Sequence, residues 1–231
     1  MRPRRLEVTF NATGAADAGT RGRVVAVVDV VDSGTSAEAA VAAGAGEVLG
    51  AAPAGLRVPA RVDPGAVGRR AAAAAGRLGS DVLVVAEPRT GTHDEQRSRC
   101  LPVLQALRTA GVAYELLPNQ GAELPRLVDV RNRVVVVVSA TGGTAFDAAL
   151  IAGAPAVCFA TTGRVEGLTG WEVAEMGAQR AVALAEEHQA DLTVVAATAN
   201  SADDVLGAFE LARAVIGRGF LRLDDRPTGP A

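Results

Sequence analysis

The stretch "VVVVVSATGGTAF" (Val134–Phe146) decides the fold class of this chain. Five consecutive valines predict a strand that is buried on both faces. A polar turn rich in Gly and Thr follows, and it leads into the alanine-rich pattern of a helix, "GGTAFDAALIAG". A buried strand that passes through a tight turn into a helix is the repeating unit of parallel α/β folds.

The same unit recurs about seven times along the chain. Apolar runs such as "RVVAVVDVV", "DVLVVAE", "APAVCFA" and "DLTVVAA" are each followed by a helical pattern. We therefore expect an α/β fold, with a mainly parallel sheet and helices on both faces. A single domain over residues 1–231 is expected, either undivided or built from two pseudo-halves, about 1–130 and 131–220. Residues 51–65 and 118–126 are expected to be loops, and 224–231 a frayed tail.

Composition excludes several classes of function. The 231 residues carry a net charge of −3, so no overall field attracts nucleic acid. All basic residues are Arg, which excludes a Schiff base to lysine and a P-loop lysine. Cys100 and Cys158 lack the spacing of a zinc site, and a reduced, cytoplasmic chain is expected. No apolar run is long enough to predict a membrane span.

In parallel sheets, ligands bind where the carboxyl ends of the strands lead into helices. The first such loop, "DVVDSGTS", holds Asp29 and Asp32 before a turn of Ser33, Gly34 and Thr35. Two carboxylates beside a turn that favours phosphate suit a bridging Mg²⁺ ion. The alternative is that Ser33 or Thr35 only caps the helix.

The stretch Val134–Phe146 supplies a second candidate phosphate site, formed by Thr141, Gly142, Gly143 and Thr144. Glycines permit positive φ angles and a close approach of backbone amides to an anion, and the threonine hydroxyls can add hydrogen bonds. The alternative is that the two glycines only let the helix pack closely on its strand.

Three further loops carry candidate residues. Glu87 and Arg89 follow a buried strand and could position a metal or clamp a phosphate, or else form a solvated loop. Arg164 could bind a phosphate or carboxylate. Asp204 lies in the first turn of the last helix, where it is either an ordinary N-terminal acid or a third metal ligand beside Asp29 and Asp32.

The order of these loops resembles the 2-phosphosulfolactate phosphatase family. The resemblance spans about Arg23 to Ile216 and rests on "DVVDSGTSAEAAVAAGA", "AEPRTG", "SATGGTA" and "TVVAATANSADDV". Asp32 stands where the family motif has arginine, and Gly142 where it has asparagine. The family's Gly-Asn-Ser-Pro segment has no counterpart.

The resemblance implies a Mg²⁺-dependent phosphatase acting on a small phosphorylated acid similar to 2-phospho-3-sulfolactate. Asp29, with Asp32 or Glu87, would hold the metal, and the turns at Ser33–Thr35 and Thr141–Thr144 would hold the phosphate. Arg89 or Arg164 would stabilise developing charge. Alanine-rich helices, which can pack closely, together with the resemblance predict a homodimer, and the net charge and hydropathy predict neither nucleic-acid nor membrane partners. Two alternatives are an enzyme with changed chemistry on the same scaffold and a catalytically decayed binding or scaffold protein.

The predicted site requires the loops at 29–36, 87–93 and 139–146 to meet at one edge of the sheet. Each follows an apolar strand and precedes a helix, which is the place where such folds bind ligands.

Overall fold

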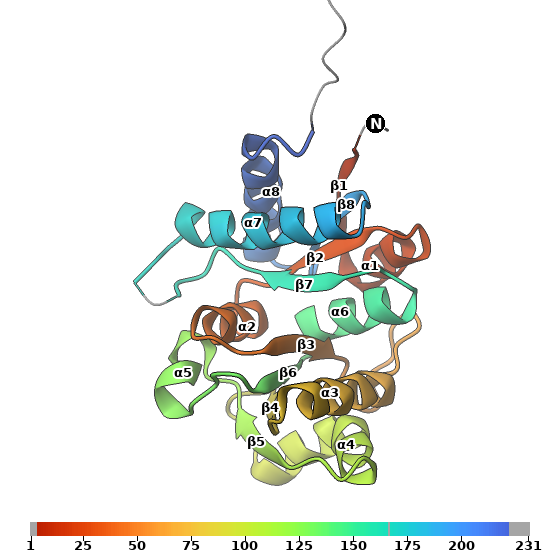
Figure 1. Ribbon diagram of the computed structural model, residues 1–231, viewed down its shortest axis with the longest axis vertical. Coiled ribbons are helices and arrows are strands. Elements are labelled where there is room, and N and C mark those ends of the chain that lie inside the picture. Colours follow the sequence, from red (N-terminus) through yellow and green to blue (C-terminus); the bar gives the residue numbers. More distant parts are fainter. Residues whose placement is uncertain (1–3, 166, 222–231) are drawn as a thin grey trace, which may run out of the picture.

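The computed structural model describes residues 4–165 and 167–221, and the predicted tail at 224–231 lies outside them. Within these ranges the chain forms eight strands in two parallel sheets of four, flanked by helices (Figure 1). The predicted α/β class is therefore confirmed. The two sheets divide the chain by its ends and its middle rather than by its two halves, because the first sheet joins β1 to β8.

The first sheet has the strand order β1-β8-β2-β7. Its strands are β1 (Leu6–Phe10), β8 (Leu192–Ala196), β2 (Val24–Val28) and β7 (Val157–Ala160). Alternate side chains of β2 face different helices, as the period of a strand requires. Val24, Ala26 and Val28 share a buried cluster with α7 (Trp171–Glu187) and α8 (Ala202–Gly217), whereas Val25 and Val27 belong to the cluster that contains α1 (Asn11–Thr20).

The second sheet has the order β3-β6-β4-β5. Its strands are β3 (Glu47–Ala51), β6 (Val134–Val138), β4 (Val82–Ala86) and β5 (Tyr114–Pro118). The five valines of β6 pair with β3 on one side and β4 on the other, and all five are fully buried, as predicted. Helices α3 (Pro64–Leu78) and α4 (His93–Thr109) pack against this sheet.

Two helices join the sheets. α2 (Ser33–Ala42) and α6 (Gly142–Ile151) each contact strands of both sheets. Phe146 of α6 stacks on Phe159 of β7 with the ring centroids 5.1 Å apart. The short helices η1 (Gly121–Glu123) and α5 (Leu124–Leu127) lie against α2. One buried cluster therefore contains side chains from both sheets.

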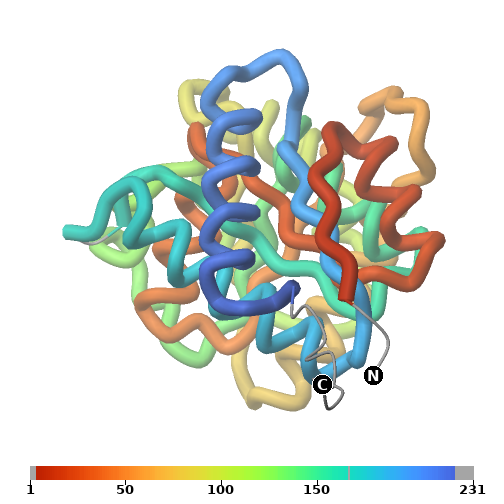
Figure 2. The backbone as a smooth tube through the Cα atoms, turned by 90° about the horizontal axis from the view of Figure 1, so that it is seen from above, coloured from red at the N-terminus to blue at the C-terminus, as the bar shows by residue number. Residues whose placement is uncertain are grey.

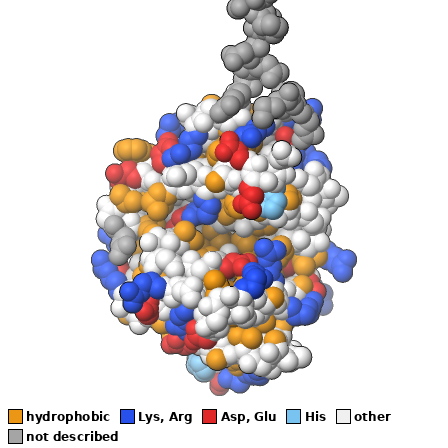
Figure 3. All heavy atoms as spheres, in the orientation of Figure 1, with side chains coloured by type: hydrophobic (Ala, Val, Ile, Leu, Met, Phe, Trp, Pro, Cys, Tyr) orange, Lys and Arg blue, Asp and Glu red, His pale blue; other side chains and the backbone are white. Residues whose placement is uncertain are grey.

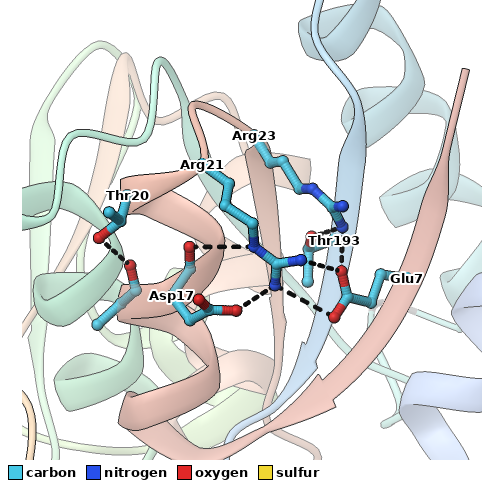
Figure 4. A network of polar contacts seen from close by, with 7 residues as sticks. Glu7, Asp17, Thr20, Arg21, Arg23 and Thr193 are labelled. Carbon is cyan, nitrogen blue, oxygen red and sulfur yellow. Dashed lines mark hydrogen bonds and ion pairs between the residues drawn. The ribbon is translucent and has the colours of Figure 1, made fainter.

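The first strand and helix, β1 and α1, were not predicted. β1 pairs with β8, so the first and last strands of the described chain lie side by side (Figure 2). Glu7 of β1 accepts hydrogen bonds from Arg21, at 3.0 and 3.2 Å, and forms an ion pair with Arg23 (Figure 4). Arg23 also lies 3.3 Å from the Thr193 hydroxyl of β8. These long-range contacts hold an edge strand whose residues are only partly buried.

Charged side chains of both signs are mixed over the face in Figure 3, with hydrophobic side chains between them. This distribution agrees with the small net charge of −3. Of the helices within residues 4–165 and 167–221, none combines the length and the hydropathy that a membrane span needs.

Candidate functional site

Asp29 connects the first two predicted loops. It directly follows β2 and is only 1% exposed. Its Oδ2 accepts hydrogen bonds from the Gly142 amide at 2.9 Å and the Thr141 hydroxyl at 2.7 Å, while its Oδ1 lies 3.4 Å from the Gly34 amide. One buried carboxylate therefore satisfies amides at the N-termini of both α2 and α6, where helices favour negative charge.

The amides at the start of α6 have partners within the protein. The Gly142 amide donates to Asp29, and the Gly143 amide donates to the Ser139 hydroxyl at 2.7 Å. The Thr144 hydroxyl donates to the Ser139 carbonyl at 2.9 Å, and Thr144 is 1% exposed. The anion at this helix N-terminus is thus the carboxylate of Asp29.

The expected positive φ angles at Gly142 and Gly143 are wrong, because neither glycine has one. Close packing requires them instead. A methyl group at Gly142 would lie 2.6 Å from the Ser33 hydroxyl and 2.7 Å from Asp29 Oδ2. At Gly143 it would lie 2.4 Å from the Ala51 carbonyl oxygen. The alternative reading of these glycines, close packing of helix on strand, is the one that fits the structure.

Capping by Ser33 or Thr35 is also wrong. α2 begins at Ser33, and the residue before it, Asp32, makes no side-chain cap. The Thr35 hydroxyl donates to the Val30 carbonyl at 2.7 Å, and the buried Ser33 hydroxyl has no hydrogen-bond partner in the described residues. Asp32 has a φ of 78°, which is unusual for a residue with a side chain.

The accessible part of the site is a cleft of about 400 Å³ beside these buried turns. It is lined by side chains and backbone of Val31, Asp32, Glu87, Pro88, Arg89, Thr90 and Arg99. Three predicted residues, Asp32, Glu87 and Arg89, therefore share one cleft. The Glu87 amide donates to the Val138 carbonyl at 3.1 Å, which places this loop beside the end of β6. The loops at 29–36, 87–93 and 139–146 thus meet, but β2 belongs to one sheet and β4 and β6 to the other, so the expectation of one edge of a single sheet is wrong.

The carboxyl group of Glu87, which lines the cleft, has a pKa well above its ordinary value. Burial raises the pKa of its carboxyl to about 7, and the negative charges of Asp29 and Asp32 act in the same direction. Asn119 opposes this rise in pKa by donating a hydrogen bond of 2.9 Å to Oε1. Near neutral pH, Glu87 therefore exists in both protonation states, as a general acid or base requires.

Arg89 and Asn119 organise the wall of the cleft. Arg89 forms an ion pair with Asp32 and donates through Nε to the Asn119 carbonyl at 3.0 Å. The Asn119 side chain accepts from the Ser36 hydroxyl and from the Gly121 amide, the latter at 3.0 Å. Asn119 is fully buried, so these bonds fix the position of Arg89 and of Glu87 together.

Asn119 and Arg99 were not predicted as site residues. Asn119 directly follows β5, so the rule that identified Glu87 after β4 could also have identified it. Arg99 lies on α4 three residues after the buried Gln96 and four before the buried Val103. That helical spacing places it next to the packed face of the helix.

The three predicted metal ligands do not form a metal site as a set. Asp204 accepts hydrogen bonds from the Val30 amide at 2.8 Å and the Thr198 amide at 3.2 Å, and burial raises its pKa to about 6. The Asp29 carboxylate accepts hydrogen bonds from backbone amides, and the Asp32 carboxylate forms an ion pair with Arg89. In the part of the chain that the structure describes, no group of three or more His, Cys, Asp and Glu side chains is placed to hold a metal ion.

Arg164 lies apart from the cleft. It lines a different pocket of about 280 Å³, together with Ala39, Ala122, Glu123, Pro125, Arg126 and Gly167. None of the described residues lines both this pocket and the cleft. The structure thus brings Arg89 close to Glu87 but places Arg164 in separate surroundings.

Comparison with known proteins gives no family for this chain. No protein-family model matches the sequence, and no curated protein matches it. The resemblance to 2-phosphosulfolactate phosphatases therefore stays a prediction.

Proposed function

We propose that this chain is a phosphatase-like hydrolase that acts on a small phosphorylated acid in the cleft between Asp32 and Glu87. The observation that carries the proposal is Glu87, whose carboxyl has a pKa of about 7 and lines the cleft beside Arg89. Perturbed acids in clefts mark candidate catalytic sites. The positive φ of Asp32 at the rim supports the same place, since strained backbone clusters at functional sites.

In this proposal Glu87 acts as the general acid or general base of the hydrolysis. Water forms a new bond to phosphorus, and the bond between phosphorus and the ester oxygen breaks. Protonated Glu87 donates its proton to the leaving oxygen, or ionised Glu87 accepts a proton from the attacking water. Arg89, which is paired with Asp32, forms part of the wall of the cleft beside Glu87.

Mg²⁺, a homodimer and a cytoplasmic location belong to the proposal because the resemblance and the composition suggest them. Asp29, Asp32 and Asp204 do not form a set of metal ligands, so the proposed steps use only water, Glu87 and the residues of the cleft. Assays with MgCl₂ and with EDTA test the metal. Light scattering tests the dimer, for which the mass should be twice that of the 23.4 kDa chain.

The experiment that tests the function is a phosphate-release assay on small phosphorylated acids. Glu87→Gln should lower kcat/KM by about 100-fold or more, because Gln cannot transfer a proton. The matched control is Glu187→Gln, an exposed acid on α7, which should leave the rate unchanged. No phosphate release by the parent protein with either MgCl₂ or EDTA, or full activity of Glu87→Gln, would contradict the proposal.

A binding protein without turnover is the second candidate function. The observation in its favour is that Asp29 and the amides of α6, which the resemblance assigns to metal and phosphate, are buried and bonded to each other. Binding of phosphorylated acids without phosphate release would support this second candidate.

A further inference from the structure

The cleft contains two arginines with different surroundings. The Arg89 guanidinium donates to the Asn119 carbonyl through Nε and forms an ion pair with the Asp32 carboxylate through Nη2. Arg99 reaches the same cleft from α4. Within residues 4–165 and 167–221, its side chain forms no hydrogen bond and no ion pair, and its Nε atom is buried without a partner.

A buried charged donor without a partner is costly to the folded protein. Solvent satisfies an exposed arginine such as Arg164, but it does not reach the Nε atom of Arg99. Arginine presents its donors as a planar fork that matches two oxygens of a phosphate or carboxylate. The missing partner of Arg99 is therefore best supplied by an oxyanion from outside the chain.

The charge of the cleft is compatible with such a ligand. The ion pair between Arg89 and Asp32 cancels two of the charges that line it. Arg99 and Glu87 remain; the positive charge of Arg99 acts to lower the pKa of Glu87, but burial outweighs it, so Glu87 is only partly ionised near neutral pH. Among the described residues that line the cleft, Arg99 is thus a cation that attracts Glu87 from a distance but has neither an ion pair nor a hydrogen bond to its buried Nε atom.

We infer that the Arg99 guanidinium binds the phosphoryl group of a small ligand in this cleft, a role that rests on the proposed function for its place in the reaction. Arg89 and Asn119 then shape the wall, while Arg99 holds the anion. No motif of the sequence indicates Arg99 as a ligand-binding residue.

Inorganic sulfate is a suitable probe because it is tetrahedral and doubly charged and cannot be hydrolysed. Calorimetric titration of the full chain at constant ionic strength should show sulfate binding that Arg99→Gln weakens by about tenfold or more. Arg99→Lys should bind with intermediate affinity, because lysine keeps the charge but loses the fork. Arg97→Gln, an exposed arginine of the same helix, should bind sulfate as the parent does.

Urea unfolding without sulfate separates ligand binding from a structural role. Arg99→Gln should keep or raise the free energy of unfolding, because it removes an unpaired buried donor. A marked loss of stability in this variant would mean that Arg99 is structural and would overturn the inference. Sulfate binding by Arg99→Gln equal to that of the parent, or no sulfate binding by the parent, would overturn it as well.

Acetate, titrated in parallel, distinguishes the source of the oxyanion. Acetate binding that is tighter than sulfate binding would assign Arg99 to a carboxylate and overturn the phosphoryl assignment. Different results would contradict the proposed function and the role of Arg99. Sulfate binding that depends on Arg99, without phosphate release, would contradict the hydrolase but support the inference. Phosphate release that Arg99→Gln leaves unchanged would support the hydrolase and overturn the inference.

Discussion

Gly143 lies where α6 meets the second sheet, and backbone atoms surround it. A methyl group there would lie 2.4 Å from the Ala51 carbonyl oxygen and 2.9 Å from that of Val137. Backbone oxygens cannot move aside as the end of a side chain can. We expect Gly143→Ala to lower the free energy of unfolding by about 1–3 kcal/mol, the usual cost of overpacking. Urea unfolding measures this change.

Gly76 provides the matched control for this substitution. It lies within α3, and a methyl group there would have no atom within 4 Å. Gly76→Ala should therefore stabilise the protein by about 0.5 kcal/mol, because alanine is the better helix former. Equal stability of the Gly143→Ala variant and the parent would show that the packing at α6 is loose.

Single residues of the site could be predicted when they follow an apolar strand. Asp29, Glu87 and Arg89 were identified in this way, and the structure places them at the meeting loops. The sequence could not show that Asp29 occupies the amides of α6, because that bond joins residues 113 positions apart. Arg99 was missed because a charged residue within a polar helical pattern is usually solvated.

Helix α4 forms one side of the cleft, and its first turn is fixed by a capping box. The Thr92 hydroxyl accepts from the Glu95 amide at 3.2 Å, and the Glu95 carboxylate accepts from the Thr92 amide at 2.8 Å. We expect Thr92→Ala to destabilise the protein by about 1 kcal/mol, because it removes the hydroxyl that accepts from the Glu95 amide, although the backbone amide at residue 92 can still donate to Glu95. Urea unfolding of the variant tests this.

Thr109, the exposed last residue of α4, gives the control. Thr109→Ala changes the same residue type without touching a cap, so it should shift stability by no more than about 0.5 kcal/mol. Equal effects of the two substitutions would contradict the role of the capping box. A frayed first turn would also loosen the cleft, since Gln96 of α4 donates to the Pro88 carbonyl at 3.0 Å.

The type of most elements could be predicted because their patterns are strong, as in the valines of β6. β1 and α1 were missed for physical reasons. "LEVTF" is short and partly buried, and α1 contains Gly14 and Gly19, which disfavour helices. Contacts far along the sequence stabilise both elements, including the pairing of β1 with β8.

At the scale of the whole molecule, the division into two sheets could not be predicted. A parallel strand can pair with any other buried strand, and the sequence of β2 does not specify β7 and β8 as its neighbours. The helices that contact both sheets, α2 and α6, also carry the turns around Asp29. The same arrangement therefore joins the sheets and brings the site loops together.

Several buried carboxyls predict how the stability of the molecule depends on pH. Glu38 of α2 is fully buried and forms an ion pair with Arg180 of α7, which also donates to the Phe159 carbonyl of β7 at 3.1 Å. Burial raises the pKa of Glu38 to about 7, although Arg180 acts to lower it. Burial also raises the pKa of Glu87 to about 7 and the pKa of Asp147 to about 6.

A raised pKa means that the folded chain binds more protons than the unfolded chain between the ordinary pKa of Glu, 4.5, and the folded value of about 7. The contribution of Glu38 to the free energy of unfolding therefore falls as pH rises through this window, by roughly 3 kcal/mol at most. Glu38→Gln does not titrate, so urea unfolding between pH 5 and pH 8, roughly the span of this window, should give a flatter curve than the parent. Glu187→Gln, the exposed control, should run parallel to the parent. Parallel curves for the parent and Glu38→Gln would mean that Glu38 stays ionised across this range and that Arg180 outweighs its burial.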